Sequence, residues 1–204
     1  DLAGGKAHTL GRILRETGFP VPDGFVITTR AFSLFLHHND LRHRLDELLA
    51  QVRLDDWDRL VGLSREMRSM IREGEIPPEV QGEIHRRLED SRRQGLAGPW
   101  VLRSSALSED GEASFAGQYA SVLRVAAPEV REAYKKVLAS KYSPPAVAYR
   151  IRLGLAPLDA LSHQVLGDPA LHDQWHRLGM DRPADLAAFE HAPQKDVTRL
   201  DAGE

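Results

Sequence analysis

The sequence contains no cysteine among its 204 residues. Disulfide bonds and thiolate metal sites are therefore excluded, and this absence fits a cytoplasmic protein. Long hydrophobic runs are absent too, since no segment approaches the roughly 20 apolar residues of a membrane-spanning helix. Neither sign of charge dominates, because 27 Lys and Arg stand against 30 Asp and Glu, for a net charge of −3. We therefore expect no membrane partner and no general attraction to nucleic acid.

No signal peptide opens the sequence, and its first residue is Asp1 rather than methionine. That start suggests a chain that begins inside a longer product. What is present is typical of a globular protein with a hydrophobic core, with 42% hydrophobic and 28% charged residues. The length suits one large domain or two small ones.

Hydrophobic periodicity predicts a mixture of helices and short strands. A helix is expected from Gly5 to Gly18 and a buried strand at residues 25–29, followed by a helix capped by Thr28 or Thr29. Three amphipathic helices are predicted between residues 39 and 94, and two more between Pro128 and Gly154. Three short helices are predicted from apolar residues beyond 154: Leu158, Leu161 and Val165; Leu171, Trp175 and Leu178; Pro183, Leu186 and Phe189. The polar tail from residue 192 is expected to fray.

The most informative stretch runs from residue 99 to residue 125. Its pattern predicts two strands, the first ending near Arg103 and the second, at residues 119–125, mostly apolar and well covered. The polar loop from Ser104 to Gly117 between them offers hydroxyls, backbone N–H groups and glycines, which with an arginine can close over an anion. The alternative is an ordinary long hairpin loop with a surface arginine.

A second anion site is predicted at Gly4-Gly5-Lys6, because glycines before a helix expose unpaired N–H groups and the helix dipole adds partial positive charge. It lacks the spacing of a P-loop, and the alternative is a structural turn followed by a surface lysine. Metal sites have weaker support. His172 and His176 have helical metal-ligand spacing but no identifiable third ligand, so a solvated pair is the alternative. The acidic cluster Glu109, Asp110 and Glu112 can hold magnesium or simply be solvated.

Three segments, in the same order and spacing, resemble the ATP-binding domain of the phosphoenolpyruvate synthase and pyruvate phosphate dikinase family. The first is Gly4-Gly-Lys-Ala-His-Thr-Leu-Gly11 with Gly18-Phe-Pro-Val-Pro-Asp-Gly-Phe-Val-Ile-Thr-Thr29. The second is Val101-Leu-Arg-Ser-Ser-Ala-Leu-Ser-Glu-Asp110 with Ala113-Ser-Phe-Ala-Gly-Gln118. The third is Leu138-Ala-Ser-Lys-Tyr-Ser-Pro-Pro-Ala-Val-Ala-Tyr-Arg150. The resemblance covers residues 3 to 154.

This resemblance implies an α+β fold, the first lobe of an ATP-grasp-like domain with a small mixed sheet and several helices. It implies that Lys6 contacts nucleotide phosphates. It also implies that Arg103 does the same and has the catalytic role of steadying the transferred phosphoryl group. Ser104, Ser105 and the loop from Ser108 to Gly117 match the family's cover over the phosphates. In the family, ATP phosphorylates a histidine on a separate swivelling domain.

The sequence departs from the family after Gly154. The second lobe, its acidic Mg²⁺ ligands and the phosphohistidine motif have no counterpart in residues 155–204, so these are expected on a further segment or chain. We therefore predict a first lobe at residues 1–154 and a divergent helical tail at residues 155–204. Two functions stay open: the ATP- and Mg²⁺-binding portion of a dikinase-type phosphotransferase, or a non-catalytic lobe that serves as an interaction or regulatory module. A lone lobe is also expected to expose an apolar face that supports a homodimer.

Overall fold

The computed structural model describes residues 5–17, 23–106, 119–154, 161–166 and 197–199. Eight helical segments, one of them a 3-10 turn, and five strands follow one another along these ranges. They are α1 (Gly5–Glu16), β1 (Gly24–Ile27), α2 (Thr29–His38), α3 (Arg42–Ala50), α4 (Trp57–Glu73), α5 (Pro78–Arg93), β2 (Trp100–Ala106), β3 (Ser121–Val125), the 3-10 turn η1 (Ala127–Glu129), α6 (Val130–Ser140), α7 (Pro144–Arg152), β4 (Leu161–Leu166) and β5 (Val197–Arg199).

The strands form one sheet in the order β3-β2-β4-β1-β5. Every pairing is antiparallel, so the mixed sheet expected from the sequence is wrong in its strand directions. In the described part of the chain, the fold is α+β: mostly helical, with a small antiparallel sheet.

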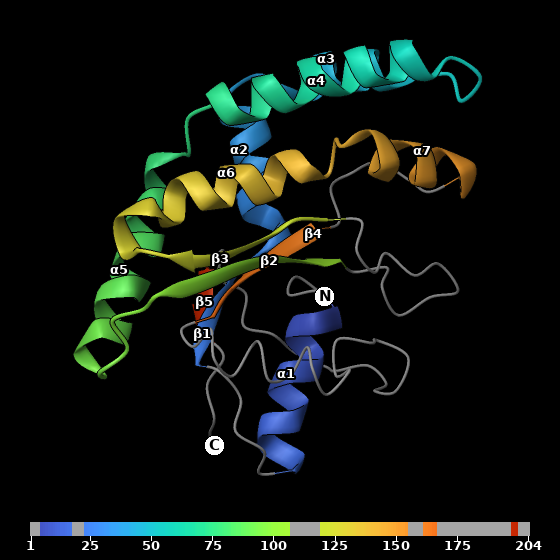
Figure 1. The fold of residues 1–204 in the computed structure, drawn as a ribbon. Coiled ribbons are helices and arrows are strands. Elements are labelled where there is room, and N and C mark those ends of the chain that lie inside the picture. The colour runs from blue at the N-terminus through green and yellow to red at the C-terminus, as the bar shows by residue number, and fades with distance from the viewer. Residues whose placement is uncertain (1–4, 18–22, 107–118, 155–160, 167–196, 200–204) are drawn as a thin grey trace.

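Helices cover the two faces of the sheet unequally (Figure 1). On one face, α6 contacts β2 and β3, α2 contacts β4, and α5 contacts β1 and β5; α4 packs outside them against α3, α6 and α7. Helix α1 lies on the other face and contacts β2. None of the helices within the described ranges is both long and apolar enough to cross a membrane.

The main core lies between the sheet and the layer of α2, α5 and α6. Strand residues Phe25, Ile27, Trp100 and Leu102 point into it and are at most 1% exposed. They meet fully buried helix residues such as Phe32 and Tyr134. The helices predicted between residues 29 and 154 and their inner faces are confirmed here, because hydrophobic spacing of three and four residues fixes which side of each helix is buried.

The helical tail expected after residue 154 is wrong where the structure describes it. Leu161 and Val165 belong to strand β4, which lies in the middle of the sheet between β1 and β2, and residues 197–199 form edge strand β5. The spacing of two apolar residues four positions apart fits one helical face, but it also fits one face of a strand. Residues 161–166 form a strand because β1 and β2 hydrogen bond to their two sides, and both partners lie far away in the sequence. The rest of the predicted tail lies outside the described residues.

Strand β3 also differs from the expectation of a well-covered strand. It is an edge strand, and Leu123 is 49% exposed. Trp100 pairs with Val125 but Leu102 pairs with Val122, so β3 holds one extra residue at this point, a β-bulge in which Arg124 has a φ of 54°. The bulge breaks the strict alternation that the sequence predicts.

Thr28 occupies the predicted cap position of α2, but its side chain makes no capping hydrogen bond. Its hydroxyl is buried without a hydrogen-bond partner among the described residues. The helix start is therefore confirmed, whereas the predicted mechanism of capping is wrong.

Candidate phosphate-binding face of the sheet

Arg103 lies in β2 on the face of the sheet opposite the main core. Trp100 and Leu102 point into the core, and side chains alternate along a strand, so Val101 and Arg103 point the other way. Val101 is fully buried and Arg103 is 7% exposed. A guanidinium held at a sheet face with so little water around it is a strong donor toward an anion, because the low dielectric strengthens charge-assisted hydrogen bonds.

Helix α1 covers this same face. Among the α1 side chains that the structure describes, Leu10 and Ile13 are buried, 2% and 3% exposed, and the helix contacts β2. Lys6 is the second residue of α1, in the first turn, where unpaired N–H groups and the helix dipole favour anions. In Figure 1 the N-terminal end of α1 points toward the sheet and its C-terminal end points away. Helix α1 and strand β2, the elements to which Lys6 and Arg103 belong, therefore contact each other.

Ser104 and Ser105 follow Arg103 in β2. Ser104 is 3% exposed, and strand alternation places it on the main-core face rather than beside Arg103. It pairs with His163 of β4, and Ser105 pairs with Ser162. The structure therefore separates the face of Ser104 from that of Arg103, while all three residues remain in one strand.

Ser140 anchors the chain where it enters β3, a contact that the sequence analysis missed. Its hydroxyl accepts a hydrogen bond from the backbone N–H of Ala120 at 3.0 Å and donates one to the carbonyl of Val137 at 2.7 Å. This ties the backbone just before β3 to the last turn of α6. No local sequence pattern predicts this contact, because its partners are 20 residues apart.

Lys141 is a second residue that the sequence analysis did not single out. It is 0% exposed, and its ammonium lies 3.5 Å from the centroid of the Phe32 ring. Lysine is rarely buried unless it is paired, so this contact matters for the core. It lies on the main-core side of the sheet, at the junction of α6 and α7, and not on the face of Arg103.

Candidate metal ligands are not gathered in the part of the chain that the structure describes. Within those ranges, no group of three or more His, Asp or Glu side chains is placed to hold a metal ion. The pair His172 and His176 and the acidic cluster at residues 109–112 lie outside the described residues.

Comparison with known proteins identifies the family. Residues 1–165 match the model of the family described as "Pyruvate phosphate dikinase, AMP/ATP-binding domain". The chain is 35% identical over 161 residues to phosphoenolpyruvate synthase of Aquifex aeolicus and 33% identical over 159 residues to that of Escherichia coli, alignments that cover 75% and 76% of the chain. It is 32% identical over 156 residues to rifampicin phosphotransferase of Bacillus subtilis, over 76% of the chain.

The chain spans only about a fifth of the length of these relatives: 19%, 20% and 18% respectively. The matched region contains α1 and β2, which form the face described above, and it ends within β4. A family model that covers most of the chain agrees with the resemblance in the three sequence segments. The chain therefore belongs to the pyruvate phosphate dikinase AMP/ATP-binding domain family.

Proposed function

We propose that this chain is the nucleotide-binding portion of a phosphotransferase of the phosphoenolpyruvate synthase and pyruvate phosphate dikinase kind, with the first lobe of an ATP-grasp-like domain at residues 1–154. Lys6 and Arg103 hold the phosphates of ATP, and Arg103 steadies the charge of the phosphoryl group during transfer. The acceptor is a histidine on another domain, and the Mg²⁺ ligands lie on a further segment or chain.

One observation carries the proposal: α1 and β2 contact each other on the sheet face toward which Arg103 points. Phosphoryl transfer depends on positioning and electrostatic stabilisation more than on covalent chemistry by the protein. A helix N-terminus with a lysine beside a buried guanidinium supplies both kinds of anion contact. Ser105 belongs to the proposed site as the continuation of β2, whereas Ser104, on the main-core face of the strand, makes no direct contact with the phosphates.

Nucleotide titration by calorimetry tests the proposal, with ATP, AMP and adenosine and with and without Mg²⁺. Arg103→Gln is expected to weaken ATP binding by about 1.5–3 kcal/mol, the usual worth of a hydrogen bond to a charged group, or roughly ten- to a hundredfold. Lys6→Ala is expected to act in the same direction while keeping a good helix former in α1. Adenosine binding should change little in either variant, because adenosine has no phosphates.

Arg12→Gln is the matched control, because Arg12 lies on the same helix but pairs with Glu16 at 2.9 Å. It should leave the affinity for ATP unchanged. Far-UV circular dichroism of Arg103→Gln separates loss of binding from loss of folding. Equal ATP affinity in wild type, Arg103→Gln and Lys6→Ala would exclude the site, and no ATP binding at millimolar nucleotide would exclude direct binding by this chain alone.

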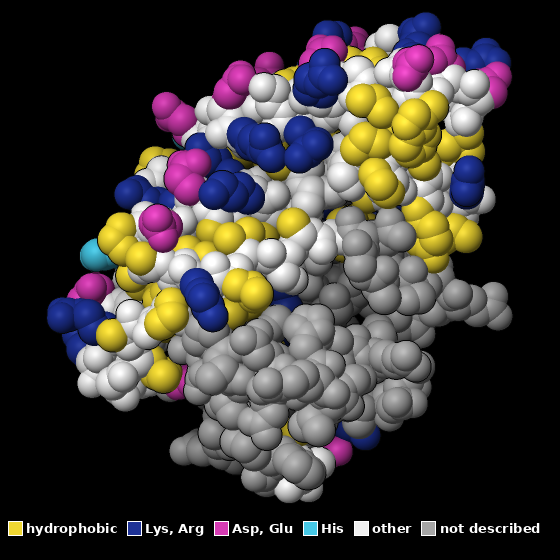
Figure 2. Space-filling view, in the orientation of Figure 1, with side chains coloured by type: hydrophobic (Ala, Val, Ile, Leu, Met, Phe, Trp, Pro, Cys, Tyr) yellow, Lys and Arg dark blue, Asp and Glu magenta, His cyan; other side chains and the backbone are white. Residues whose placement is uncertain are grey.

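The second candidate, a lobe that acts as an interaction module through a homodimer, is favoured by an exposed apolar patch. Leu54, before α4, and Trp57, its first residue, are 39% and 52% exposed; Ile151 and Leu153, at the end of α7, are 39% and 44% exposed. Helices α4 and α7 contact each other, and Figure 2 shows hydrophobic side chains gathered at this end of the molecule. Sedimentation should then show a dimer that Trp57→Glu converts to monomer; a wild-type monomer at all concentrations would contradict this candidate.

A further inference from the structure

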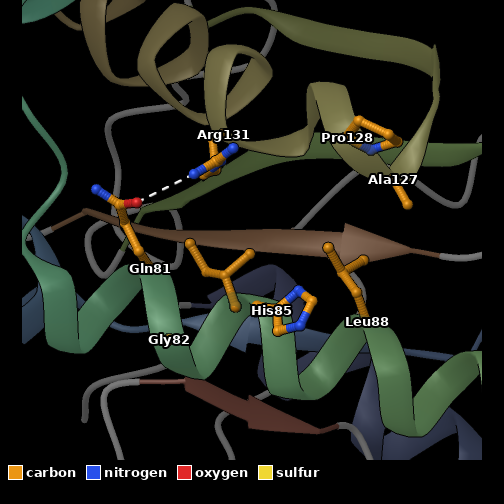
Figure 3. Close-up of a pocket in the computed structure, with 8 residues that line it drawn as sticks. Gln81, Gly82, His85, Leu88, Ala127, Pro128 and Arg131 are labelled. Carbon is orange, nitrogen blue, oxygen red and sulfur yellow. Dashed lines mark hydrogen bonds between the residues drawn. The ribbon is translucent and has the colours of Figure 1, made fainter.

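A pocket of about 300 Å³ opens between α5 and the segment of η1 and α6. Its polar residues are Gln81 and His85 on α5 and Arg131 on α6. Figure 3 shows Arg131 directed across the gap toward Gln81, with His85 and Leu88 further along the same helix. The guanidinium donates to the side-chain oxygen of Gln81 at 3.1 Å. The pocket lies on the main-core side of the sheet, away from Arg103.

The charge of Arg131 is not matched by a carboxylate within the described ranges. Its one hydrogen bond there goes to the neutral amide of Gln81. The arginines along α5 behave differently, because each forms an ion pair with a glutamate or aspartate of its own helix: Arg86, Arg87, Arg92 and Arg93. A guanidinium has five N–H donors in a planar fork that fits a carboxylate through two parallel bonds. Arg131 therefore has donors left for an anionic group in the pocket.

The other side of the pocket is apolar. Ile84 is 1% exposed and forms part of its lining, with Leu88 and Pro128 beside it. An inorganic anion would gain nothing from these side chains, whereas an organic body would bury its own apolar surface against them. The volume lies at the lower end of the range for small-molecule sites, and apolar walls with a few polar groups are typical of such sites.

We propose that the α5–α6 pocket binds a small organic carboxylate. The carboxylate takes a bidentate hydrogen bond from Arg131, with His85 at the pocket's edge as a second polar contact, and the apolar body packs against Ile84, Leu88 and Pro128. This site is separate from the proposed nucleotide site, since it lies on the opposite side of the sheet. The proposal for this pocket does not depend on whether the chain binds ATP.

The test is a titration of the full chain with benzoate, followed by ¹H–¹⁵N NMR, with benzamide, acetate and inorganic phosphate as comparison probes. Benzoate is expected to bind in roughly the millimolar range and to shift the amide signals of residues around the pocket. Benzamide lacks the charge and acetate lacks the apolar body, so each should bind at least about tenfold more weakly, the equivalent of one lost contact of about 1.4 kcal/mol. Phosphate should bind more weakly than benzoate for the same reason as acetate.

Arg131→Gln removes the charge at an exposed position, so the fold should persist, and benzoate affinity should fall at least about tenfold. Arg86→Gln is the matched control on α5 and should leave the affinity unchanged. The proposal is overturned if benzoate shows no saturable binding, if benzamide or phosphate binds as tightly as benzoate, or if Arg131→Gln binds benzoate as wild type does. Shifts that map to the face of Arg103 instead of the pocket would overturn it as well.

Discussion

The contact between Lys141 and Phe32 makes a quantitative prediction about the core. Both residues are 0% exposed, and the ammonium lies 3.5 Å from the ring centroid. Lys141 directly follows the last residue of α6 and Phe32 is on α2, so the contact joins two helices that cover different strands. A cation over a ring in a desolvated position is worth about 2 kcal/mol. We therefore expect Lys141 and Phe32 to be coupled by about that amount.

A double-mutant cycle measures this coupling. Phe32→Leu removes the ring but keeps an apolar side chain, and Lys141→Met removes the ammonium but keeps an unbranched stem. The free energy of unfolding of the two single variants and the double variant, from urea titrations followed by circular dichroism, yields the pairwise energy directly. Each single variant should lose the contact, so the double variant should be less destabilised than the sum by about 2 kcal/mol.

Phe35→Leu is the matched control for this cycle. Phe35 is also 0% exposed on α2 in the same core, but the cation stands over the ring of Phe32. Its coupling to Lys141→Met should be clearly smaller than that of Phe32→Leu. A coupling near zero for Phe32, or equal couplings for both phenylalanines, would refute the claim that the ring face holds the ammonium in the core.

Three further predictions concern the packing, the ionisation and the backbone of the described residues. Gly74→Ala should lower the free energy of unfolding in urea by about 1–3 kcal/mol, because its new Cβ would lie 2.6 Å from the ring of Phe35. Gly62→Ala is the control: it has open space around it and should stabilise α4 by up to about 1 kcal/mol. Burial raises the pKa of Tyr134 above its ordinary value of 10.0, so the unfolded chain loses this proton before the folded protein does. The free energy of unfolding is therefore unaffected by this group below pH 10 and falls above it, and Tyr134→Phe should lessen that fall by up to about 1.4 kcal/mol per pH unit. Identical slopes for wild type and Tyr134→Phe above pH 10 would contradict this. Arg124→Gly should stabilise the β3 bulge by about 0.5–1 kcal/mol, because a φ of 54° strains any residue with a Cβ, and an equal gain from Arg124→Ala would show that strain is not the cause.

Local patterns predicted most of the helices and three of the strands. The start of α1, the strand β1 and the proline-led helices α5 and α7 all follow from residues within a few positions of each boundary. The strand at Arg103 is predicted correctly for the same reason, since the apolar run before it belongs to β2, but the strand continues to Ala106, so the expectation that the polar loop begins at Ser104 is wrong. These elements can be predicted because the residues that determine them are neighbours in the sequence.

The features that the sequence did not predict depend on distant partners. Strand β4 forms because β1 and β2, more than 50 residues before it, hydrogen bond to its two sides. Lys141 can be buried because the ring of Phe32, from a helix far earlier in the chain, lies beneath it. The bulge at Arg124 arises because Val122 and Val125 both pack toward the core beside β2. In each case the interaction that determines the structure joins residues that are too far apart in the sequence for hydrophobic periodicity to predict it.

The candidate nucleotide site likewise depends on the sheet, which relates segments that are distant in the sequence. Lys6 and Arg103 are almost 100 residues apart, and the sequence alone gives each a plausible surface role. Alternation along β2 divides its residues between two unequal environments: Trp100 and Leu102 fill a core under three helices, and Arg103 lies on the face that α1 covers. Because α1 and Arg103 share that second face, the relation between the two segments follows from the sheet and not from either local pattern, and the main core on the other face takes no part in it.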